Sequence, residues 1–418
     1  MKSILVIAMI ALASTLAGCG GGGSSASAPA GVTVDPGDSS ATVNWKNDAS
    51  VQYWVWVAQS PNVSTDDCAT MTGCQIFTNV RPPFIITGLV NGKTYSVTVN
   101  GRHNDGPGGS GSPTIAFVPR LAGATWTVGA PLTGSNLLGV GYTSSLSTGL
   151  PGLATVGAAG TIFTTGNVTA WAAATSGTTA NLNAVQHRDN LFVAIGDGGA
   201  VVTSPDSVTW TPRSTPTTNA LYALDGSGSG QVVAVGAQGT ILSTSNSTEW
   251  TARTSGTAAN LYGVGFGDNR YVAVGANGTV VTSSDGTTWT LQKPPTSVDL
   301  RGIFFGSRNA TSNVTAIATF VAVGRGGTIL TSPDGITWTA RASGVTADLE
   351  SVTFGTQFVA VGQGGTVVTS SDGGVTWARA DSGTTANLNS VSFTLLTPKV
   401  IGVGYVAVGD GGTNLTAF

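Results

Sequence analysis

A unit of about 40 residues recurs seven times after residue 125 and constrains the fold more than any other feature of the sequence. Each unit reads as a Trp-bearing strand, a polar connector, an Asn/Asp-Leu-x-small-Val strand, a VAVG-like strand, a Gly-x-x-Gly turn and a further strand. The tryptophans that mark the units are Trp126, Trp171, Trp210, Trp250, Trp289, Trp338 and Trp377. The sequence therefore predicts one four-stranded supersecondary unit, stacked seven times.

The ends of this array are out of phase in a complementary way. Gly412–Phe418 read as a third strand whose Trp-bearing partner is missing, while Thr125–Trp126–Thr127 stand before the first complete unit as an orphan fourth strand. We expect the two to pair, because pairing removes the open edge of the array. Four-stranded units closed in this way predict a seven-bladed β-propeller over residues 120–418.

The turn before each tryptophan has a spelling of its own, shown by Ser370, Asp372, Gly374, Thr376 and Trp377. Short Asp and Ser side chains can bond the backbone amides of their own turn, and Gly takes the left-handed position. The acid stands at Asp206, Asp285, Asp334 and Asp372, whereas Asn167 and Asn246 replace it in two units. This neutral replacement predicts that the turn requires hydrogen bonding, not charge or metal coordination.

The same residues carry a family resemblance. The turn resembles the Asp-box of bacterial neuraminidase-type (BNR) repeats, and VAVGQGGTVVTSSDGG with Trp377 resembles the repeat of photosystem II assembly-factor-like propellers. The resemblance implies an all-β propeller that binds a protein partner. That family is associated with a basic patch, and this chain has a basic series after its Trp strands: Arg213, Arg253, Lys293, Arg341 and Arg379. Protection of exposed strand edges is the other reading of the series.

The chain opens with a targeting signal. Lys2 precedes the apolar run Ile4–Leu16, which is too short to span a bilayer, and Leu16-Ala17-Gly18-Cys19 resembles a bacterial lipobox. The resemblance implies a signal peptide over 1–18 and lipid on Cys19, with Gly20 typical of lipoproteins of the outer membrane. We expect a protein of the cell envelope, periplasmic or surface-exposed, with a flexible Gly/Ser-rich tether over 19–30.

Residues 31–119 predict a second, smaller all-β domain. Short β-rich runs separated by turn signals indicate a β-sandwich, and Leu89–Tyr95 resembles the fibronectin type III pattern, with Tyr95 in the tyrosine-corner position. Trp54 and Trp56 share one strand face. They form either an exposed platform on which a sugar can stack or a pair of packing residues. Cys68 and Cys74 are expected to form a disulfide in an oxidising compartment, with a metal site as the alternative.

Positions that vary in chemistry on a constant frame are where we expect recognition. The Gly-x-x-Gly turns and the starts of the innermost strands share one face of an antiparallel array, opposite the Asp-box turns. The turn residues include Asp197, Gln238, Asn277, Arg325, Gln363 and Asp410. The residues after each innermost Leu are Leu138, Asn183, Tyr222, Tyr262, Arg301, Glu350 and Asn389. Among them, Tyr222, Tyr262, Arg301, Glu350, Asp197, Arg325 and Asp410 are the candidate ligand-binding residues, unless they only solvate that face.

Composition narrows the function. Only 9% of residues are charged and the net charge is −3, which disfavours nucleic-acid binding. The two glutamates, Glu249 and Glu350, and the two histidines, His103 and His187, suggest no catalytic set, no metal site and no cofactor. The preferred reading is a binding or assembly module for a protein or glycan. The alternatives are a sialidase-like or other glycosidase or lyase using a carboxylate such as Glu350 or Asp410, and an architectural envelope protein.

Overall fold

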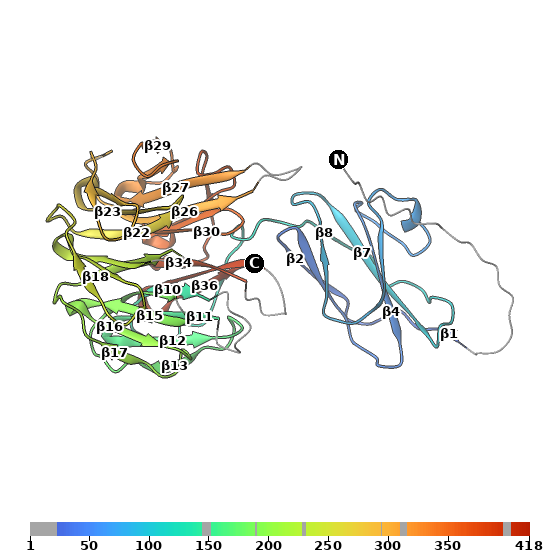
Figure 1. Ribbon diagram of the computed structural model, residues 1–418. Helices are drawn as coiled ribbons and strands as arrows, with labels where there is room; N and C mark the ends of the chain where they lie inside the picture. The colour runs from blue at the N-terminus through green and yellow to red at the C-terminus, as the bar shows by residue number, and fades with distance from the viewer. Residues whose placement is uncertain are drawn as a thin grey trace, which may run out of the picture. The chain divides into compact units, whose positions relative to one another are not determined.

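The computed structural model describes residues 23–143, 152–188, 190–227, 231–293, 295–309, 316–395 and 403–418 (Figure 1). In these ranges the regular elements are strands and three-residue 3₁₀ turns, and no helix has the length and apolarity needed to cross a membrane. Two compact units are present: residues up to Pro36 with Ala41–Pro119, and Gly37–Ser40 with Arg120–Phe418. The signal peptide expected over 1–18 and the lipidation site Cys19 lie outside the described residues.

The first unit consists of two antiparallel sheets around one core. One has the order β1 (Ser24–Ser25), β7 (Tyr95–His103), β4 (Gln52–Ala58), β5 (Gln75–Val80), with β8 (Ile115–Phe117) also paired to β7. The other is β2 (Thr33–Gly37), β3 (Ser40–Asn44), β6 (Phe84–Thr87). The core forms because alternate residues of each strand point the same way, so that both sheets contribute buried side chains such as Val43, Val55, Ile86 and Val97.

Three local features of this unit bear on the sequence analysis. The hydroxyl of Tyr95 accepts a 3.1 Å hydrogen bond from the Val90 N–H, as a tyrosine corner requires. Cys68, in the turn η1 (Cys68–Thr70), is bonded to Cys74 with their Cα atoms 5.4 Å apart. The tether expected over 19–30 is ordered from Ser24 onward, because β1 pairs with His103 and Arg102 and supplies backbone bonds to the edge of β7.

The second unit contains, among the described residues, seven four-stranded antiparallel sheets. The innermost strands are β10 (Leu137–Tyr142), β14 (Leu182–Arg188), β18 (Leu221–Gly226), β22 (Leu261–Gly267), β26 (Leu300–Arg308), β30 (Leu349–Phe354) and β34 (Leu388–Thr394). The second strands are β11 (Leu153–Gly157), β15 (Leu191–Gly196), β19 (Val232–Gly236), β23 (Arg270–Gly275), β27 (Ile317–Gly324), β31 (Phe358–Gly362) and β35 (Gly404–Gly409). The second strands are almost wholly buried, as their VAVG-like sequence suggests.

The outer half of each sheet follows a 3₁₀ turn. These turns are η3 (Ala158–Gly160), η4 (Asp197–Gly199), η5 (Ala237–Gly239), η6 (Ala276–Gly278), η7 (Arg325–Gly327), η8 (Gln363–Gly365) and η9 (Asp410–Gly412). The third strands are β12 (Thr161–Thr165), β16 (Val201–Ser204), β20 (Ile241–Thr244), β24 (Val280–Ser283), β28 (Ile329–Ser332), β32 (Val367–Ser370) and β36 (Asn414–Ala417). The outermost are β13 (Ala172–Thr175), β17 (Thr211–Arg213), β21 (Thr251–Arg253), β25 (Thr290–Leu291), β29 (Thr339–Arg341), β33 (Ala378–Ala380) and β9 (Thr127–Val128).

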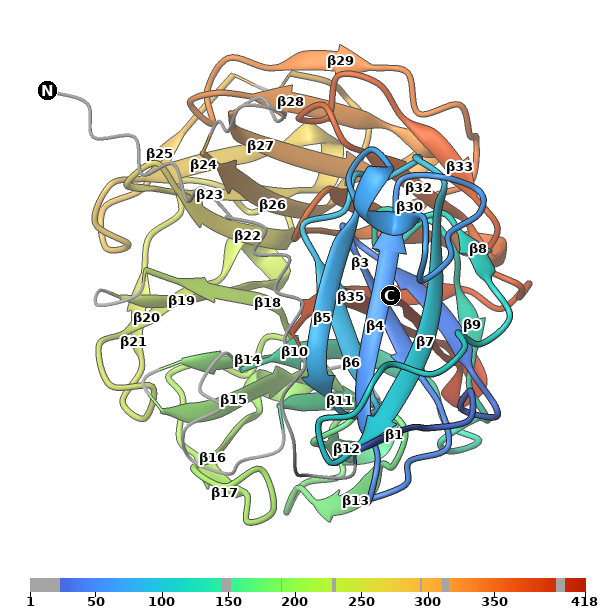
Figure 2. The same cartoon turned by 90° about the vertical axis from the view of Figure 1, so that its right-hand side faces the viewer.

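The sheets, numbered here as blades 1 to 7 from β10 to β34, form a ring. Each innermost strand contacts the next, and β34 contacts β10. Figure 2 shows blades of this ring from β10 through β14, β18, β22 and β26. The seventh blade is completed from the start of the unit: β9 pairs with β36, with Val128 opposite Leu415 and Thr127 opposite Thr416. The pairing expected between the two ends of the array is therefore confirmed.

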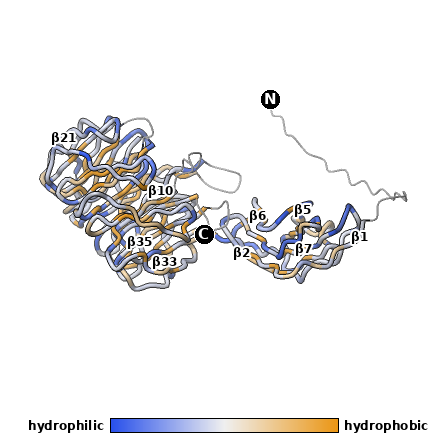
Figure 3. The backbone as a smooth tube through the Cα atoms, turned by 90° about the horizontal axis from the view of Figure 1, so that it is seen from below, coloured by the Kyte–Doolittle hydropathy of each residue, from blue (hydrophilic) through white to orange (hydrophobic). Residues whose placement is uncertain are grey.

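Tryptophan-bearing apolar clusters hold neighbouring blades together. One such cluster joins Val156 and Ile162 of blade 1 to Leu182 and Phe192 of blade 2 and includes Trp210. Equivalent clusters occupy the other junctions, and the apolar segments run through the interior of the ring (Figure 3). Blade 5 has a longer inner hairpin, because the ladder between β26 and β27 continues to Arg308 opposite Ile317.

The Asp-box turns have the local bonding that the sequence predicts. Asp285 Oδ1 accepts the N–H groups of Thr287 and Thr288, both at 2.8 Å. Asn246 Oδ1 accepts the two equivalent N–H groups at 3.0 and 2.9 Å. Because Asn and Asp make the same bonds, the prediction that this position requires a hydrogen-bond acceptor is confirmed.

Candidate binding site at the channel mouth

A β-bulge places one side chain from each blade at the mouth of the channel. Every innermost strand begins with a Leu that is 0% exposed, and its pairing register skips the following residue. A bulge bends the strand and re-aims the unpaired side chain. The bulged residues are the seven that the sequence singles out: Leu138, Asn183, Tyr222, Tyr262, Arg301, Glu350 and Asn389.

These seven residues line one cavity with a volume of about 330 Å³, to which all seven innermost strands contribute. All seven side chains are partly buried. The buried Leu anchors the strand while the bulged residue is free to vary, so the frame stays constant and the lining changes from blade to blade. This arrangement can recognise a ligand without altering the packing between blades.

The turn residues divide into two positions that the sequence does not distinguish. Asp197, Arg325, Gln363 and Asp410 are the first residues of their 3₁₀ turns. Gln238 and Asn277 are second residues, with φ of 54° and 53°, so they are not equivalent to the other four. The blades that carry Ala at the first position are those with Leu138, Tyr222 and Tyr262 at the bulge. Small turn residues thus accompany large bulged ones.

An aromatic and charged sector spans blades 3 to 6. The rings of Tyr222 and Tyr262 have centroids 5.6 Å apart, and the Arg301 guanidinium lies 4.3 Å from the Tyr262 centroid. Glu350 follows Arg301 in the next blade. Stacking of this kind holds Arg301 against an aromatic face.

Three further side chains surround that sector with charge. Asp299 Oδ2 lies 3.7 Å from Arg301 Nη2 and 3.4 Å from Arg325 Nε, and Asp348 Oδ2 lies 4.0 Å from Arg325 Nε. Gln363 donates to Asp348 Oδ2 at 3.3 Å. Arg325 is thereby shared between two carboxylates.

An amide sector occupies blades 7 and 2. Asn183 Nδ2 donates to Asp197 Oδ1 at 2.9 Å, and Asn389 Nδ2 donates to Asp410 Oδ1 at 3.0 Å. The second oxygen of each carboxylate accepts from another amide, Asn181 for Asp197 and Asn387 for Asp410, both at 2.9 Å. Neutral amide donors therefore fix the position of both carboxylates.

Burial changes the acidity of two groups at the mouth. Desolvation raises the pKa of Glu350, opposed by the nearby Arg301 and reinforced by Asp348. Desolvation also raises the pKa of Tyr222, reinforced by Tyr262 and Asp197. Glu350 is therefore a carboxyl whose charged form is poorly solvated in the protein alone.

Sequence reasoning missed the residue before each innermost Leu. At six of the seven junctions its side-chain oxygen accepts the backbone N–H of the second turn residue in the preceding blade. The six acceptors in the described chain are Asn136, Asn181, Asn260, Asp299, Asp348 and Asn387, at 2.8 to 3.0 Å. At the junction of blades 2 and 3 this position is Ala220. The Asn or Asp that precedes the innermost Leu in the repeat is the sequence signal for this link, but the repeat pattern by itself indicates only that this residue belongs to a strand.

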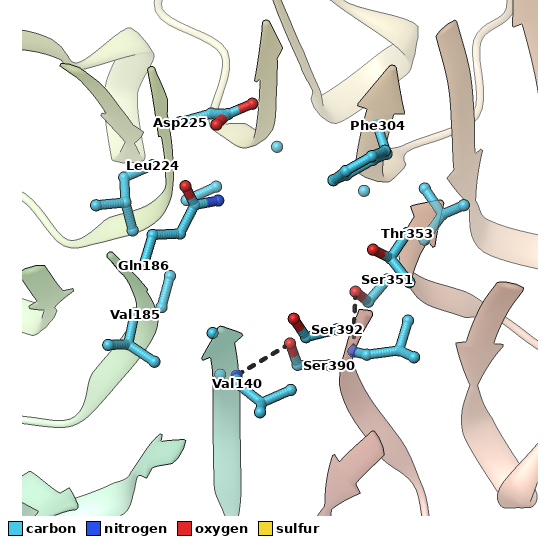
Figure 4. A pocket seen from close by; sticks show the side chains of 18 of the residues that line it. Val140, Val185, Gln186, Leu224, Asp225, Phe304, Ser351, Thr353, Ser390 and Ser392 are labelled. Carbon is cyan, nitrogen blue, oxygen red and sulfur yellow. Dashed lines mark hydrogen bonds between the residues drawn. The ribbon is translucent and has the colours of Figure 1, made fainter. Parts of the chain in front are cut away.

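The deeper channel carries a second polar layer, which the sequence did not reveal. Figure 4 shows Gln186 and Asp225 on one side and Ser351, Ser390 and Ser392 on the other. Asp225 binds Arg188 Nη2 at 2.6 Å and the Phe266 N–H at 2.9 Å. Ser390 Oγ accepts the Val140 N–H, and Ser351 Oγ accepts the Val391 N–H. These contacts tie neighbouring innermost strands together.

The basic series does not form one belt. Arg213, Arg253 and Arg341 share a register position and donate through Nε to hydroxyls of the third strand at 2.8 to 2.9 Å. Gln292 occupies this place in blade 4, beside Lys293, and Ala380 occupies it in blade 6, beside Arg379. Arg213, Arg253 and Arg341 therefore have a structural role, because each is hydrogen-bonded to the third strand of its own blade.

The tryptophan pair of the first unit is neither a core element nor an open platform. Trp54 and Trp56 lie on the sheet face opposite the core, with ring centroids 6.0 Å apart, and both are half-buried. Arg102 covers Trp54 at 5.0 Å, and Trp56 Nε1 donates to Asn100 at 2.8 Å. This stack leaves less ring surface for a sugar than the sequence suggested.

Comparisons with known proteins agree with this architecture. The model of a family described as the DUF6242 beta propeller domain matches residues 152–261. YCF48 from Cyanidioschyzon merolae is similar with a TM-score of 0.54 and 19% identity, over 70% of this chain and 99% of that chain. A structure of YCF48 bound to D1 peptide has the same TM-score and 18% identity, over 70% and 94%. The WD40 beta propeller domain of Doa1 also has a TM-score of 0.54, with 12% identity, over 71% and 97%.

A search among curated proteins gives no match. The second unit is a β-propeller. At these identities the likeness to YCF48 shows the fold alone.

Proposed function

We propose that the chain is an exported, lipid-anchored binding or assembly module whose propeller recognises a protein partner at the channel mouth. The observation that carries the proposal is the ring of bulged residues: seven blades of one design present seven side chains of different chemistry to one cavity. Constant packing with variable lining is the expected design of a recognition surface. One similar propeller, YCF48, has been solved bound to D1 peptide.

The N-terminal segment supports the envelope location. Lipid on Cys19 would anchor the chain in the outer membrane, and only four residues lie between Cys19 and Ser24, where the first sheet begins. The five Cα–Cα steps from Cys19 to Ser24 span at most about 18 Å. We therefore place the first unit, interpreted as a fibronectin type III-like spacer, close to the membrane surface. A Cys19→Ala variant should move the protein from the membrane fraction to the soluble fraction.

The test of recognition is capture from envelope extract. The full chain is immobilised beside the variants Arg301→Ala and Tyr262→Ala, and captured proteins are identified by mass spectrometry. We expect both variants to lose a protein that the native chain retains. A matched control is Arg213→Ala, which removes an arginine from an outermost strand. Equal capture by all four proteins contradicts a protein site at the mouth.

A glycan array and product analysis accompany the capture. Saturable glycan binding that is lost in Tyr262→Ala, without any captured protein, would replace the protein partner by a glycan. Turnover of a bound glycan would replace the binding module by an enzyme.

A further inference from the structure

The charges around the mouth do not balance. We count the bulged residues, the first residues of the 3₁₀ turns and the residues that form ion pairs with either set, within the described part of the chain. Together they contain five carboxylates and two guanidinium groups. The carboxylates are Asp197, Asp299, Asp348, Glu350 and Asp410, and the cations are Arg301 and Arg325. The mouth therefore carries three negative charges in excess, equal to the net charge of the whole chain.

Arg188, which lines the same cavity, pairs with Asp225, and three further arginines of the propeller lie far from this excess. Arg213, Arg253 and Arg341 stand on outermost strands, three strand spacings or about 14 Å from the innermost strand. That distance exceeds the Debye length of about 8 Å at physiological ionic strength. A ligand at the channel axis thus meets the field of the inner carboxylates.

Glu350 differs from the other four carboxylates, because the Gln363 side chain is its hydrogen-bond partner and the described residues provide it with neither a close ion pair nor two amide donors. Asp299 and Asp348 share the arginines, and Asp197 and Asp410 each accept two amide bonds. No ion pair within 4.0 Å among the described residues includes Glu350, because Arg301 lies on the Tyr262 ring and toward Asp299. A partly buried carboxylate that lines a cavity is stabilised by a cation brought into that cavity.

We propose that the channel mouth receives a lysine or arginine side chain of the protein partner, with its cation against Glu350 and its aliphatic stem against Tyr222, because Arg301 already covers the Tyr262 ring. This deepens the proposed function and rests on it. The aromatic face of Tyr222 suits such a stem because long basic side chains bury their methylene groups on apolar surface while the charge stays in a polar site. An acidic segment is disfavoured, because it would add charge to a mouth that is already negative.

The first experiment uses fluorescently labelled synthetic peptides with the same Gly/Ser flanking sequence. They differ only at two central residues, which are Lys-Lys, Arg-Arg, Gln-Gln or Glu-Glu. Fluorescence anisotropy with the full chain should show at least tenfold tighter binding of a basic peptide than of the Gln-Gln peptide, with a preference that weakens as salt is added. Glu350→Gln should abolish the preference. Asp372→Asn is the matched control: it removes one carboxylate from the opposite face, at a position where other blades carry Asn.

The extract capture separates this inference from the proposed function. If capture depends on Arg301 and Tyr262 but is unchanged by Glu350→Gln and by salt, the module stands and the cationic inference is overturned. Binding of the Glu-Glu peptide as tightly as the Lys-Lys peptide also overturns it. If no captured protein depends on the mouth, the proposed function fails, and with it this inference. Loss of capture in Glu350→Gln but not in Asp372→Asn supports both.

Discussion

Asn387 accepts the backbone N–H of Gly364 at 2.9 Å across the junction between blades 6 and 7. The amide nitrogen of the same side chain donates to Asp410 within blade 7, also at 2.9 Å. One carboxamide therefore fixes two successive turns at the channel mouth. Asn181 makes the equivalent pair of bonds, to the Ala159 N–H and to Asp197.

Removing this link should cost stability and loosen the mouth. We expect Asn387→Ala to lower the free energy of unfolding by about 1–3 kcal/mol, because two hydrogen bonds are lost and a turn N–H loses its acceptor. Urea denaturation followed by tryptophan fluorescence measures the change. Asn387→Asp keeps the acceptor for Gly364 but sets a second charge beside Asp410, so it should also be destabilised. A native-like midpoint for the Ala variant would show that the link is dispensable.

The junction that lacks the link offers the opposite change. Ala220 stands before Leu221, where the other junctions have Asn or Asp. We expect Ala220→Asn to supply an acceptor for the N–H of Gly198 and to raise the free energy of unfolding by about 0.5–1.5 kcal/mol. The same denaturation experiment applies, with Ala220→Leu as the control for side-chain size. Stabilisation by Leu as large as that by Asn would exclude the hydrogen bond as the cause.

Closure of the ring predicts a cooperative loss of structure. β9 contributes the fourth strand of blade 7, and Trp126, which is 7% exposed, packs in the cluster that includes Tyr405 and Leu415. Deleting Ala124–Val128 should therefore unfold the propeller as one unit, not blade 7 alone. Differential scanning calorimetry should then show that the main thermal unfolding transition is lost. Thr127→Ala removes only an exposed side chain and should melt like the native chain.

The sequence predicted the frame of this protein better than its chemistry. The repeat period, the closing strand and the bulged positions follow from patterns of buried Leu, Val and Trp, because burial imposes the same residue on every blade. The links made by Asn181 and Asn387 were not predicted, since they join a turn to the next blade and depend on where the ring brings those segments. The sequence also could not show that Asp197 is the first residue of its turn and Gln238 the second, because the φ angles distinguish the two positions. Ser24 falls in the range predicted as a tether, because a strand of two residues, Ser24–Ser25, is too short to show an alternating pattern in the sequence.

The Asp-box turns predict a specific acid sensitivity. The Thr288 and Thr287 N–H groups hold the pKa of Asp285 well below its usual range. A lowered folded pKa contributes stability above the unfolded value of about 3.9, which is lost as pH falls through the folded pKa. Asp285→Asn keeps the acceptor but loses the charge, so it should be less stable than the native chain near pH 7, with a difference that narrows well below pH 4, in denaturation curves recorded at both. Asp285→Ala removes the acceptor and should be less stable at both pH values.

Glu350 should show the reverse dependence. Burial raises its pKa above the unfolded value of about 4.3, so the folded state holds the proton more tightly and the free energy of unfolding falls as pH rises above that value. Glu350→Gln removes the poorly solvated charge, and we expect it to be more stable than the native chain near pH 7 and similar to it at about pH 4. Denaturation across this interval, with Asp372→Asn for comparison, measures the difference. A stabilised variant that has lost its basic peptide would identify Glu350 as a residue kept for binding at the expense of stability.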